Sequence, residues 1–406
     1  METQPYRRNH TDPSDDEFAA LLEEELAAAI CEEEDTQKFK RPRLEEDTCV
    51  HPSVIKGMCV KCAQIVDDDD LSAVPLGYIH RDLKVASQEL ARLRKKDLNT
   101  LFQKKKLILV LDLDHTLLNS TQFQHISPDE ECLKNQIDSV NLFRLDQIQM
   151  FTKLRPFVRD FLIQSSRLFE LYIYTMGEQR YAMEMARLLD PDNAYFNSRV
   201  ISQGDCTKKH QKGLDVVLGA ESAVIVLDDT EHVWRQHKEN LILMDRYHYF
   251  SASLRSFGLN NKSLSEVKRD ESESDGALAT ILQVLKRIHQ LFFDSECHDD
   301  LMGRDVRHVL KTVRGEVLNG CKLVFSGIWR IGEKAENQKL WRVAEELGAI
   351  CCEELDSSVT HVVSTDVGTK KSRWAKKHQK FLVHPGWIEA ANFLWKRQPE
   401  ENFRCK

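Results

Sequence analysis

Three apolar runs in this sequence each end in polar residues, and this pattern constrains the fold more than any other feature. The runs span 107–111, 169–174 and 223–227, and segments with helical periodicity lie between them. Buried strands that alternate with helices are typical of a parallel, doubly wound α/β sheet. Such sheets bind ligands beyond the carboxyl ends of their strands. The polar residues that follow each run of this chain would lie at that edge.

The first run is followed by two aspartates, Asp112 and Asp114. Residues i and i+2 of a strand point to the same side, so both carboxylates would lie together at the edge of the sheet. Two buried like charges are costly unless a cation or a proton neutralises them. A divalent metal and a phosphoryl substrate would meet that need.

Hydrolysis of a phosphate ester needs an in-line nucleophile, an acid for the leaving alkoxide, and positive charge near the phosphoryl oxygens. Asp112 is suited to attack and form an aspartyl-phosphate, and Asp114 to act first as acid and then as base. Thr175, which follows the second run, can donate its hydroxyl to the phosphoryl group. Lys212, between the second and third runs, can supply the positive charge.

A magnesium site is predicted from the same strand ends. Mg²⁺ prefers hard oxygen ligands and keeps some of its waters, and Asp112, the Asp114 carbonyl and Asp229 can provide such oxygens. Taken singly, each residue has a simpler interpretation, because strand-terminal aspartates often cap helices or turns and most lysines are solvated. The ordered set is far more specific than its parts.

In this order the motifs resemble those of the haloacid dehalogenase superfamily, and within it the FCP/SCP family of RNA polymerase II C-terminal-domain phosphatases. The resemblance covers residues 100–294, and its motifs are 112–118, 153–157, 174–177, 212–214, 227–229 and 270–278. It implies a Rossmannoid catalytic domain in which Asp112 is the nucleophile and Asp114 the general acid and base. Thr175 and Lys212 would bind the phosphoryl group.

The resemblance also implies a metal cofactor, Mg²⁺, with Mn²⁺ or Co²⁺ as alternatives. The implied metal residues are Asp112, Asp114, Asp228 and Asp229. Arg199 matches a position that would assist charge balance.

Residues 315–406 predict a second, small α/β domain, in which strands near 323–325, 360–363 and 381–383 alternate with helices. Gly348-Ala349, the strand containing His361, and Trp387 at the start of the last helix make this segment resemble a BRCT domain. In BRCT domains that bind phosphopeptides, the matching residues are Ser326, Gly327 and Lys371. The alternative is a structural serine beside a solvated basic helix.

Four potential metal ligands, Cys49, His51, Cys59 and Cys62, lie within 14 residues. Zn²⁺ takes four such ligands tetrahedrally, and Cys-x₂-Cys is the usual half-site. FCP-type phosphatases carry a similar segment. The alternative is a few unrelated thiols in a flexible tail.

The charge of the chain is unevenly spread, with 19 acidic and 8 basic side chains in residues 1–70. We therefore expect residues 1–80 to be largely disordered, with the phosphatase domain at 81–296, a linker at 297–314 and the BRCT domain at 315–406. A helix over 17–34 and a basic cluster at 38–43, a candidate nuclear-import signal, lie in the tail. Direct nucleic-acid binding, a signal peptide and a membrane span are not expected.

The resemblance implies a function. It predicts a nuclear protein-serine phosphatase that regulates transcription by acting on the phosphorylated C-terminal heptad repeats of the largest polypeptide of RNA polymerase II. The general transcription factor TFIIF is a further implied partner. Two alternatives remain open: a BRCT-based scaffold that binds phosphorylated partners, with catalysis secondary, and a small-molecule phosphatase of the same superfamily.

Overall fold

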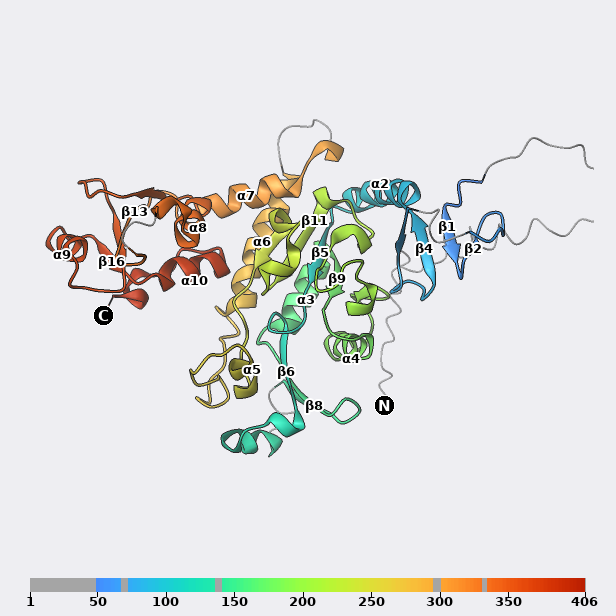
Figure 1. The fold of residues 1–406 in the computed structure, drawn as a ribbon, viewed down its shortest axis with the longest axis horizontal. Coiled ribbons are helices and arrows are strands. Elements are labelled where there is room, and N and C mark those ends of the chain that lie inside the picture. Colours follow the sequence, from blue (N-terminus) through green and yellow to red (C-terminus); the bar gives the residue numbers. More distant parts are fainter. Residues whose placement is uncertain (1–48, 67–71, 136–140, 295–300, 331–333, 406) are drawn as a thin grey trace, which may run out of the picture. The chain divides into compact units, whose positions relative to one another are not determined.

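The computed structural model describes residues 49–66, 72–135, 141–294, 301–330 and 334–405. The chain divides into two compact units, with the boundary between Leu93 and Arg94 (Figure 1). The helix expected over 17–34 and the basic cluster at 38–43 lie outside the described residues.

The first unit holds a small antiparallel sheet that the sequence analysis did not predict. Its strands, in the order β2-β1-β4-β3, are β1 (Ser53–Ile55), β2 (Met58–Cys59), β3 (Ala73–Pro75) and β4 (Leu83–Ala86). Strands of two to four residues are too short to show an alternating pattern in the sequence. Within residues 1–80, which we expected to be largely disordered, the described parts 49–66 and 72–80 contribute to this sheet.

A five-stranded parallel sheet forms the centre of the second unit, as the apolar runs predicted. Its order is β10-β9-β5-β11-β12, with β5 (Leu107–Leu111), β9 (Phe169–Tyr174), β10 (Val200–Ile201), β11 (Val224–Asp228) and β12 (Leu241–Leu243). Every residue of β5 and β11 is buried, which explains why both read as continuous apolar runs. The α/β, doubly wound fold is confirmed.

The strand order reverses next to β5. The chain moves outward from β5 to β9 and β10, and then returns to β11 on the other side of β5. Ligands of open α/β sheets bind at such a switch point, beyond the carboxyl ends of the strands. The ends of β5 and β11 are therefore the place to look for a site.

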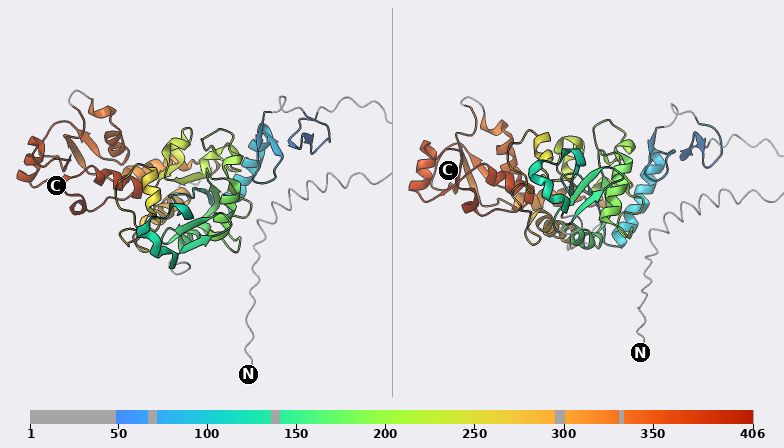
Figure 2. Two further views of the ribbon diagram at one scale, coloured as in Figure 1. Left: turned by 60° about the horizontal axis from the view of Figure 1, so that its bottom comes forward. Right: turned by 90° about the horizontal axis from the view of Figure 1, so that it is seen from below.

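Helices pack on both sides of the central sheet (Figure 2). The helices before the C-terminal part are α2 (Ser87–Gln103), α3 (Val158–Ser166), α4 (Gln179–Leu189), α5 (Ser251–Ser256), α6 (Ala277–Phe293) and α7 (Val306–Glu316). Of these, α3 contacts β9 and α4 contacts β10. The α6 helix presents a stripe of buried residues, including Leu278, Leu282 and Leu285, at the spacing predicted from the sequence. Within the described residues, no helix is long and apolar enough to cross a membrane.

A three-stranded antiparallel sheet, inserted between β5 and α3, was not predicted. It consists of β6 (Leu118–Gln122), β7 (Leu142–Leu145) and β8 (Met150–Leu154), in the order β6-β8-β7. The end of β8 is tied to a distant motif, because Lys153 pairs with Asp270 at 2.9 Å and Arg155 with Glu271 at 2.7 Å. Two motifs that looked separate in the sequence are thus joined by two ion pairs whose basic side chains are buried.

The C-terminal part of the second unit is a four-stranded parallel sheet in the order β14-β13-β15-β16. Its strands and helices are β13 (Lys322–Ser326), α8 (Lys339–Glu346), β14 (Ile350–Cys352), β15 (His361–Ser364), α9 (Lys370–Lys377), β16 (Phe381–Val383) and α10 (Gly386–Leu394). Successive residues of β13 contribute to two separate cores, Leu323 and Phe325 to one and Val324 to the other. This alternation places helices over both faces of the sheet, as the sequence predicted.

Candidate active site

The two central strands bring two aspartates side by side. Leu111 of β5 lies opposite Leu227 of β11, so Asp112 and Asp228 occupy equivalent positions at the ends of these strands. The amide of Asp112 donates to the carbonyl of Leu227, which continues the ladder up to the site. Both side chains are buried, so their charges need partners.

Lys212 bridges these two carboxylates. Its Nζ lies 2.6 Å from Asp112 Oδ1 and 2.6 Å from Asp228 Oδ2, and the lysine is only 4% exposed. The indole of Trp234 also donates to Asp228 Oδ2, at 2.8 Å. The sequence predicted Lys212 at a helix start, whereas the structure places it before a short 3-10 turn, Leu214–Val216.

The electrostatics of this buried group favour a charged Lys212 beside an Asp112 carboxyl group that is hard to ionise. Burial alone would lower the pKa of Lys212, but the charges of Asp112 and Asp228 raise it above its usual value. Burial, followed by repulsion from Asp228, raises the pKa of Asp112 well above the ordinary range. One lysine does not balance this set of aspartates, so a further positive charge would stabilise it.

A divalent cation fits the residues present. Asp112, Asp228 and Asp229 each offer a carboxylate oxygen within 4.8 Å of the others. Asp112 Oδ2 is fully buried and accepts no hydrogen bond from any described residue, so it is the oxygen most in need of a ligand. Both oxygens of Asp228 already accept hydrogen bonds, from Thr230 N, Lys212 and Trp234. Its carboxylate is therefore better placed to hold Lys212 than to bind a metal.

Asp114 is held by a tyrosine that sequence reasoning missed. The hydroxyl of Tyr181, from α4, donates to Asp114 Oδ1 at 2.5 Å and also contacts Ser120 Oγ at 2.9 Å. Gly177 makes room for the ring, since a Cβ at this position would lie 2.7 Å from Tyr181 Cδ1. Burial raises the pKa of Asp114, and the hydrogen bond from Tyr181 partly opposes this rise. The carboxyl group can thus hold a proton more readily than a solvated aspartate does.

Thr175 and Asp229 complete the predicted set at the same edge of the sheet. Thr175 is buried directly after β9, the neighbour of β5, and its Oγ1 accepts a hydrogen bond from the Gly177 amide at 3.0 Å. Asp229 follows β11, and its Oδ2 accepts from Thr230 Oγ1 at 2.9 Å and from Arg246 Nε. The strand ends therefore gather all the side chains predicted to bind the phosphoryl group and the metal.

Arg199 does not join this group. Its guanidinium donates to the backbone carbonyls of Leu171, in the middle of β9, at 3.1 Å, and of Tyr195 at 3.0 Å. The expected role in charge balance is not supported, because these carbonyls hold the side chain along the strand rather than at its end. Arg246, which pairs with Asp229, is the arginine at the site.

Three site residues have no recognisable signal in the sequence: Tyr181, Trp234 and Arg246. Each comes from a helix or loop whose approach to the strand ends is set by packing rather than by a local motif. Tyr181 and Trp234 lie shortly after predicted strands, and that position could have pointed to them. Arg246 follows β12, a strand that the sequence analysis did not predict.

The three residues of the predicted phosphopeptide pocket lie together at the end of β13. Ser326 Oγ donates to Thr369 Oγ1 at 2.8 Å, and a Cβ on Gly327 would lie 3.6 Å from Thr369 Cγ2. Lys371 Nζ donates to the carbonyls of Phe325 at 3.1 Å and Glu353 at 2.7 Å. A hydroxyl and an ammonium group thus converge beside Gly327, whose φ of +66° suits glycine.

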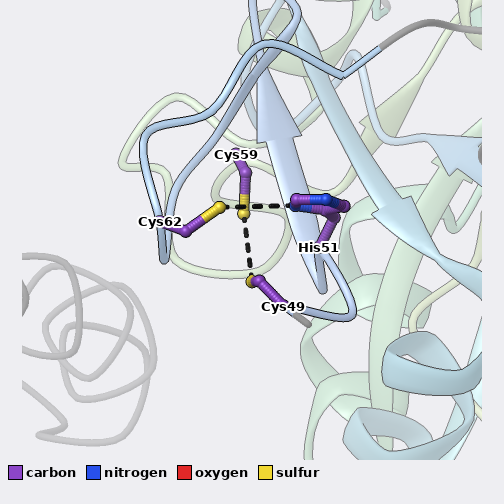
Figure 3. Close-up of side chains that lie close together, drawn as sticks. All are labelled: Cys49, His51, Cys59 and Cys62. Carbon is purple, nitrogen blue, oxygen red and sulfur yellow. Dashed lines mark hydrogen bonds between the residues drawn. The ribbon is translucent and has the colours of Figure 1, made fainter. Parts of the chain in front are cut away.

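In the first unit, the structure also brings together Cys49, His51, Cys59 and Cys62, the four residues predicted to bind zinc (Figure 3).

Comparisons with known proteins agree with this geometry. The model of the NLI interacting factor-like phosphatase family matches residues 107–295, and that of the twin BRCT domain matches residues 330–387. Together they define a phosphatase domain followed by a BRCT domain.

The relatives make the assignment more specific. The chain is 49% identical to "RNA polymerase II C-terminal domain phosphatase-like 4" of Arabidopsis thaliana, over 97% of this chain and 95% of that relative. It is 30% identical to an RNA polymerase II C-terminal domain phosphatase of Caenorhabditis elegans, over 88% of this chain and 56% of that relative. The solved structure of Fcp1, an RNA polymerase II CTD phosphatase, matches 78% of this chain and all of its own, with a TM-score of 0.60 and 25% identity. The chain belongs to the FCP-type family of RNA polymerase II C-terminal-domain phosphatases and is a protein phosphatase.

Proposed function

We propose that this protein removes phosphate from serines of the RNA polymerase II C-terminal repeats through an aspartyl-phosphate on Asp112. The observation that carries the chemistry is the buried, unpartnered Oδ2 of Asp112, beside the Lys212 ammonium group at a switch point of the sheet. The relative from Arabidopsis thaliana, whose name specifies the C-terminal domain, matches nearly the whole chain and supports the substrate.

In the first step, Asp112 attacks phosphorus and the bond from phosphorus to the serine oxygen breaks. Asp114 gives its proton to that oxygen, which leaves as the serine hydroxyl. Lys212 and the Thr175 hydroxyl hold the phosphoryl oxygens while negative charge shifts among them. Since Lys212 is fixed by Asp112 and Asp228, it needs little rearrangement to act.

In the second step, Asp114, now a carboxylate, takes a proton from water as the water oxygen attacks phosphorus. The bond from phosphorus to Asp112 then breaks and inorganic phosphate leaves. Tyr181 fixes the orientation of the Asp114 carboxyl group in both steps through its hydrogen bond.

Mg²⁺, or Mn²⁺ or Co²⁺ in its place, would be held by Asp112, Asp229 and the backbone carbonyl of Asp114 and would offset the charge of the phosphoryl group. Arg246 and Thr230 both bond to Asp229 Oδ2 and so fix the carboxylate, and its Oδ1 is the oxygen we assign to the metal. Asp228 would instead keep Lys212 in place.

We further propose that the BRCT domain binds a phosphorylated segment of the polymerase or of another nuclear partner through Ser326, Gly327 and Lys371. Six of the eleven residues 370–380 are lysine or arginine, which suits an acidic or phosphorylated ligand. The substrate implies a nuclear location, and TFIIF stays a proposed partner. The division into a phosphatase domain at 81–296, a linker at 297–314 and a BRCT domain at 315–406 is part of this proposal.

The test is phosphate release from a synthetic repeat peptide that carries phosphoserine, with and without Mg²⁺. The unmodified chain and an Asp192→Asn variant, which alters an exposed aspartate outside the site, should be equally active and Mg²⁺-dependent. Asp112→Asn should be inactive. Equal activity in Asp112→Asn would contradict the mechanism, and no activity in any variant would favour the alternative of a BRCT-based scaffold.

A further inference from the structure

Three cysteines and one histidine of the first unit point toward a common centre (Figure 3). Cys49 Sγ lies 3.9 Å from Cys59 Sγ, and Cys62 Sγ lies 3.4 Å from His51 Nδ1. Tetrahedral zinc, with bonds of about 2.3 Å to sulfur and about 2.0 Å to nitrogen, separates its ligand atoms by about 3.5–3.8 Å. Both distances are close to those of a zinc tetrahedron.

The backbone around these residues is arranged as in a metal-binding loop. Lys56 and Gly57, with φ of 52° and 78°, form the tight turn between β1 and β2, which places Cys59 at the end of the hairpin. The amide of Lys61 donates to Cys59 Sγ at 3.4 Å. Such amide hydrogen bonds stabilise a thiolate and orient it toward a metal.

Ala63, directly after Cys62, has a φ of 56°, which is unfavourable for a residue with a side chain. Its amide donates to the Cys59 carbonyl at 2.9 Å, so the chain closes on itself around the two cysteines. A strained conformation of this kind persists where surrounding interactions hold it, and a bound metal would be such an interaction.

The described part of the first unit has too little apolar core to be stable on that core alone. Its described residues, 49–66 and 72–93, bury only a few apolar side chains, namely Val54, Cys59, Leu76, Leu83, Val85 and Leu90. Segments of roughly 40 residues usually need a metal, disulfides or a partner to fold.

A disulfide does not account for the cluster. A disulfide has a sulfur–sulfur bond of about 2.05 Å, well below the 3.9 Å between Cys49 and Cys59. All three cysteines are free thiols. A single disulfide would also leave the third cysteine and the histidine without a reason to converge.

We propose that Cys49, His51, Cys59 and Cys62 bind one zinc ion whose role is structural. Four protein ligands leave no open position for water or substrate, which distinguishes this site from a catalytic zinc site. The ion joins the β1–β2 hairpin to the residues that precede it. The site is separate from the carboxylates of the phosphatase domain in both its residues and its ligand type, because thiolates select zinc over magnesium.

The first test measures the metal content of the full chain purified from zinc-supplemented cells. We expect about one equivalent of zinc per chain. Cys59→Ser and Cys62→Ser should lower this to less than one-tenth, whereas Cys132→Ser, which alters an exposed thiol elsewhere, should leave it unchanged. Absence of zinc from the unmodified chain would overturn the proposal, and this result does not depend on whether a variant folds.

The second test replaces zinc with Co²⁺ and records the visible spectrum. Tetrahedral thiolate ligation should give intense ligand-field bands, which octahedral oxygen ligands do not produce, and a sulfur-to-cobalt charge-transfer band, which no oxygen ligand produces. Asp229→Asn should leave these bands intact and Cys62→Ser should abolish them. Bands that persist in Cys62→Ser, or that disappear in Asp229→Asn, would place the metal elsewhere and contradict the assignment.

Discussion

The phosphatase and BRCT domains both place a lysine and a hydroxyl group beside the end of a parallel strand, but they surround the lysine differently. Lys212 is buried between the carboxylates of Asp112 and Asp228, at 2.6 Å from each. Lys371 donates to two backbone carbonyls, and Ser326 bonds to the hydroxyl of Thr369. In the mechanism that we propose, the first arrangement supplies a nucleophile and an acid, whereas the second supplies only groups that hold a phosphate. We infer that the carboxylates, which are found only in the phosphatase arrangement, would turn phosphate binding into phosphate transfer.

The largest expected effect comes from removing the buried lysine. Lys212→Met should lower kcat by about 10³-fold, because one preorganised donor to a developing charge contributes about that much. It should also destabilise the fold by about 3 kcal/mol, since two buried carboxylates lose their partner. Steady-state assays with an aryl phosphate and thermal unfolding measure the two effects. Lys209→Met, at an exposed position nearby, is the control. Nearly normal turnover in Lys212→Met would contradict the role of this lysine in holding the phosphoryl group.

The next effect is a pH dependence of stability that we expect in the BRCT domain because of His361. His361 is buried between the rings of Phe381 and Trp387, and burial lowers its pKa to about 4 from an unfolded value of 6.5. The unfolded state therefore binds more protons between these values, so stability falls as the pH drops from about 6.5 to about 4. The full loss is about 3 kcal/mol.

Hydrogen exchange of the β15 amides across this range measures the loss. We expect faster exchange at the acid end after correction for intrinsic rates. His378→Gln, which alters an exposed histidine, should keep the same dependence. A flat profile would mean that His361 is not held neutral by its burial.

A smaller effect is expected from the BRCT pocket. A double variant, Ser326→Ala with Lys371→Ala, should weaken binding of a phosphopeptide by about 30-fold, since it removes one neutral and one charge-assisted hydrogen bond. Hydrolysis of an aryl phosphate should not change. Calorimetric titration measures the first quantity, and Lys376→Ala, on the exposed face of the same helix, controls for general loss of positive charge. Equal losses of binding in the double variant and the control would indicate a diffuse electrostatic effect instead of a pocket.

The smallest effect concerns Tyr181. Its hydrogen bond lowers the pKa of Asp114 from the value that burial alone would produce, so Tyr181→Phe should raise that pKa further. The acidic limb of the pH profile, where Asp114 must be ionised to act as base, should move to higher pH. The maximal rate should fall about 10-fold. The control Tyr195→Phe should leave the acidic limb in place. If the limb also stays in place in Tyr181→Phe, Tyr181 has only a packing role.

The sequence predicted the parts of this molecule that are locally encoded. The strands β5, β9 and β11 are continuous apolar runs, and the residues that follow them, Asp112, Thr175 and Asp229, were assigned from that position. The short strands β1 to β4 lack enough residues for a pattern, and β6 carries Asn119, Ser120 and Thr121 among its five residues, so both sheets were missed.

The remaining errors come from tertiary packing. Tyr181 and Arg246 reach the site only because α4 and the segment after β12 pack toward the strand ends, which no local motif encodes. Arg199 was assigned by a motif match, but the carbonyls of Leu171 and Tyr195 hold its side chain along β9. Motifs predicted the residues that gather at the strand ends, and packing determined which further residues contact them.

The central claim is that Asp112 becomes phosphorylated during turnover. An Asp114→Asn variant lacks the base that hydrolyses the intermediate, whereas an aryl phosphate with a good leaving group needs no acid to form it. The phosphorylated enzyme should therefore accumulate after this variant is mixed with such an ester and Mg²⁺. Rapid quenching, reduction with borohydride and peptide mass spectrometry should find residue 112 converted to homoserine, the product expected of an aspartyl-phosphate. The same product at another aspartate, or turnover by the unmodified chain with no modification of residue 112 under rapid quenching, would contradict the account.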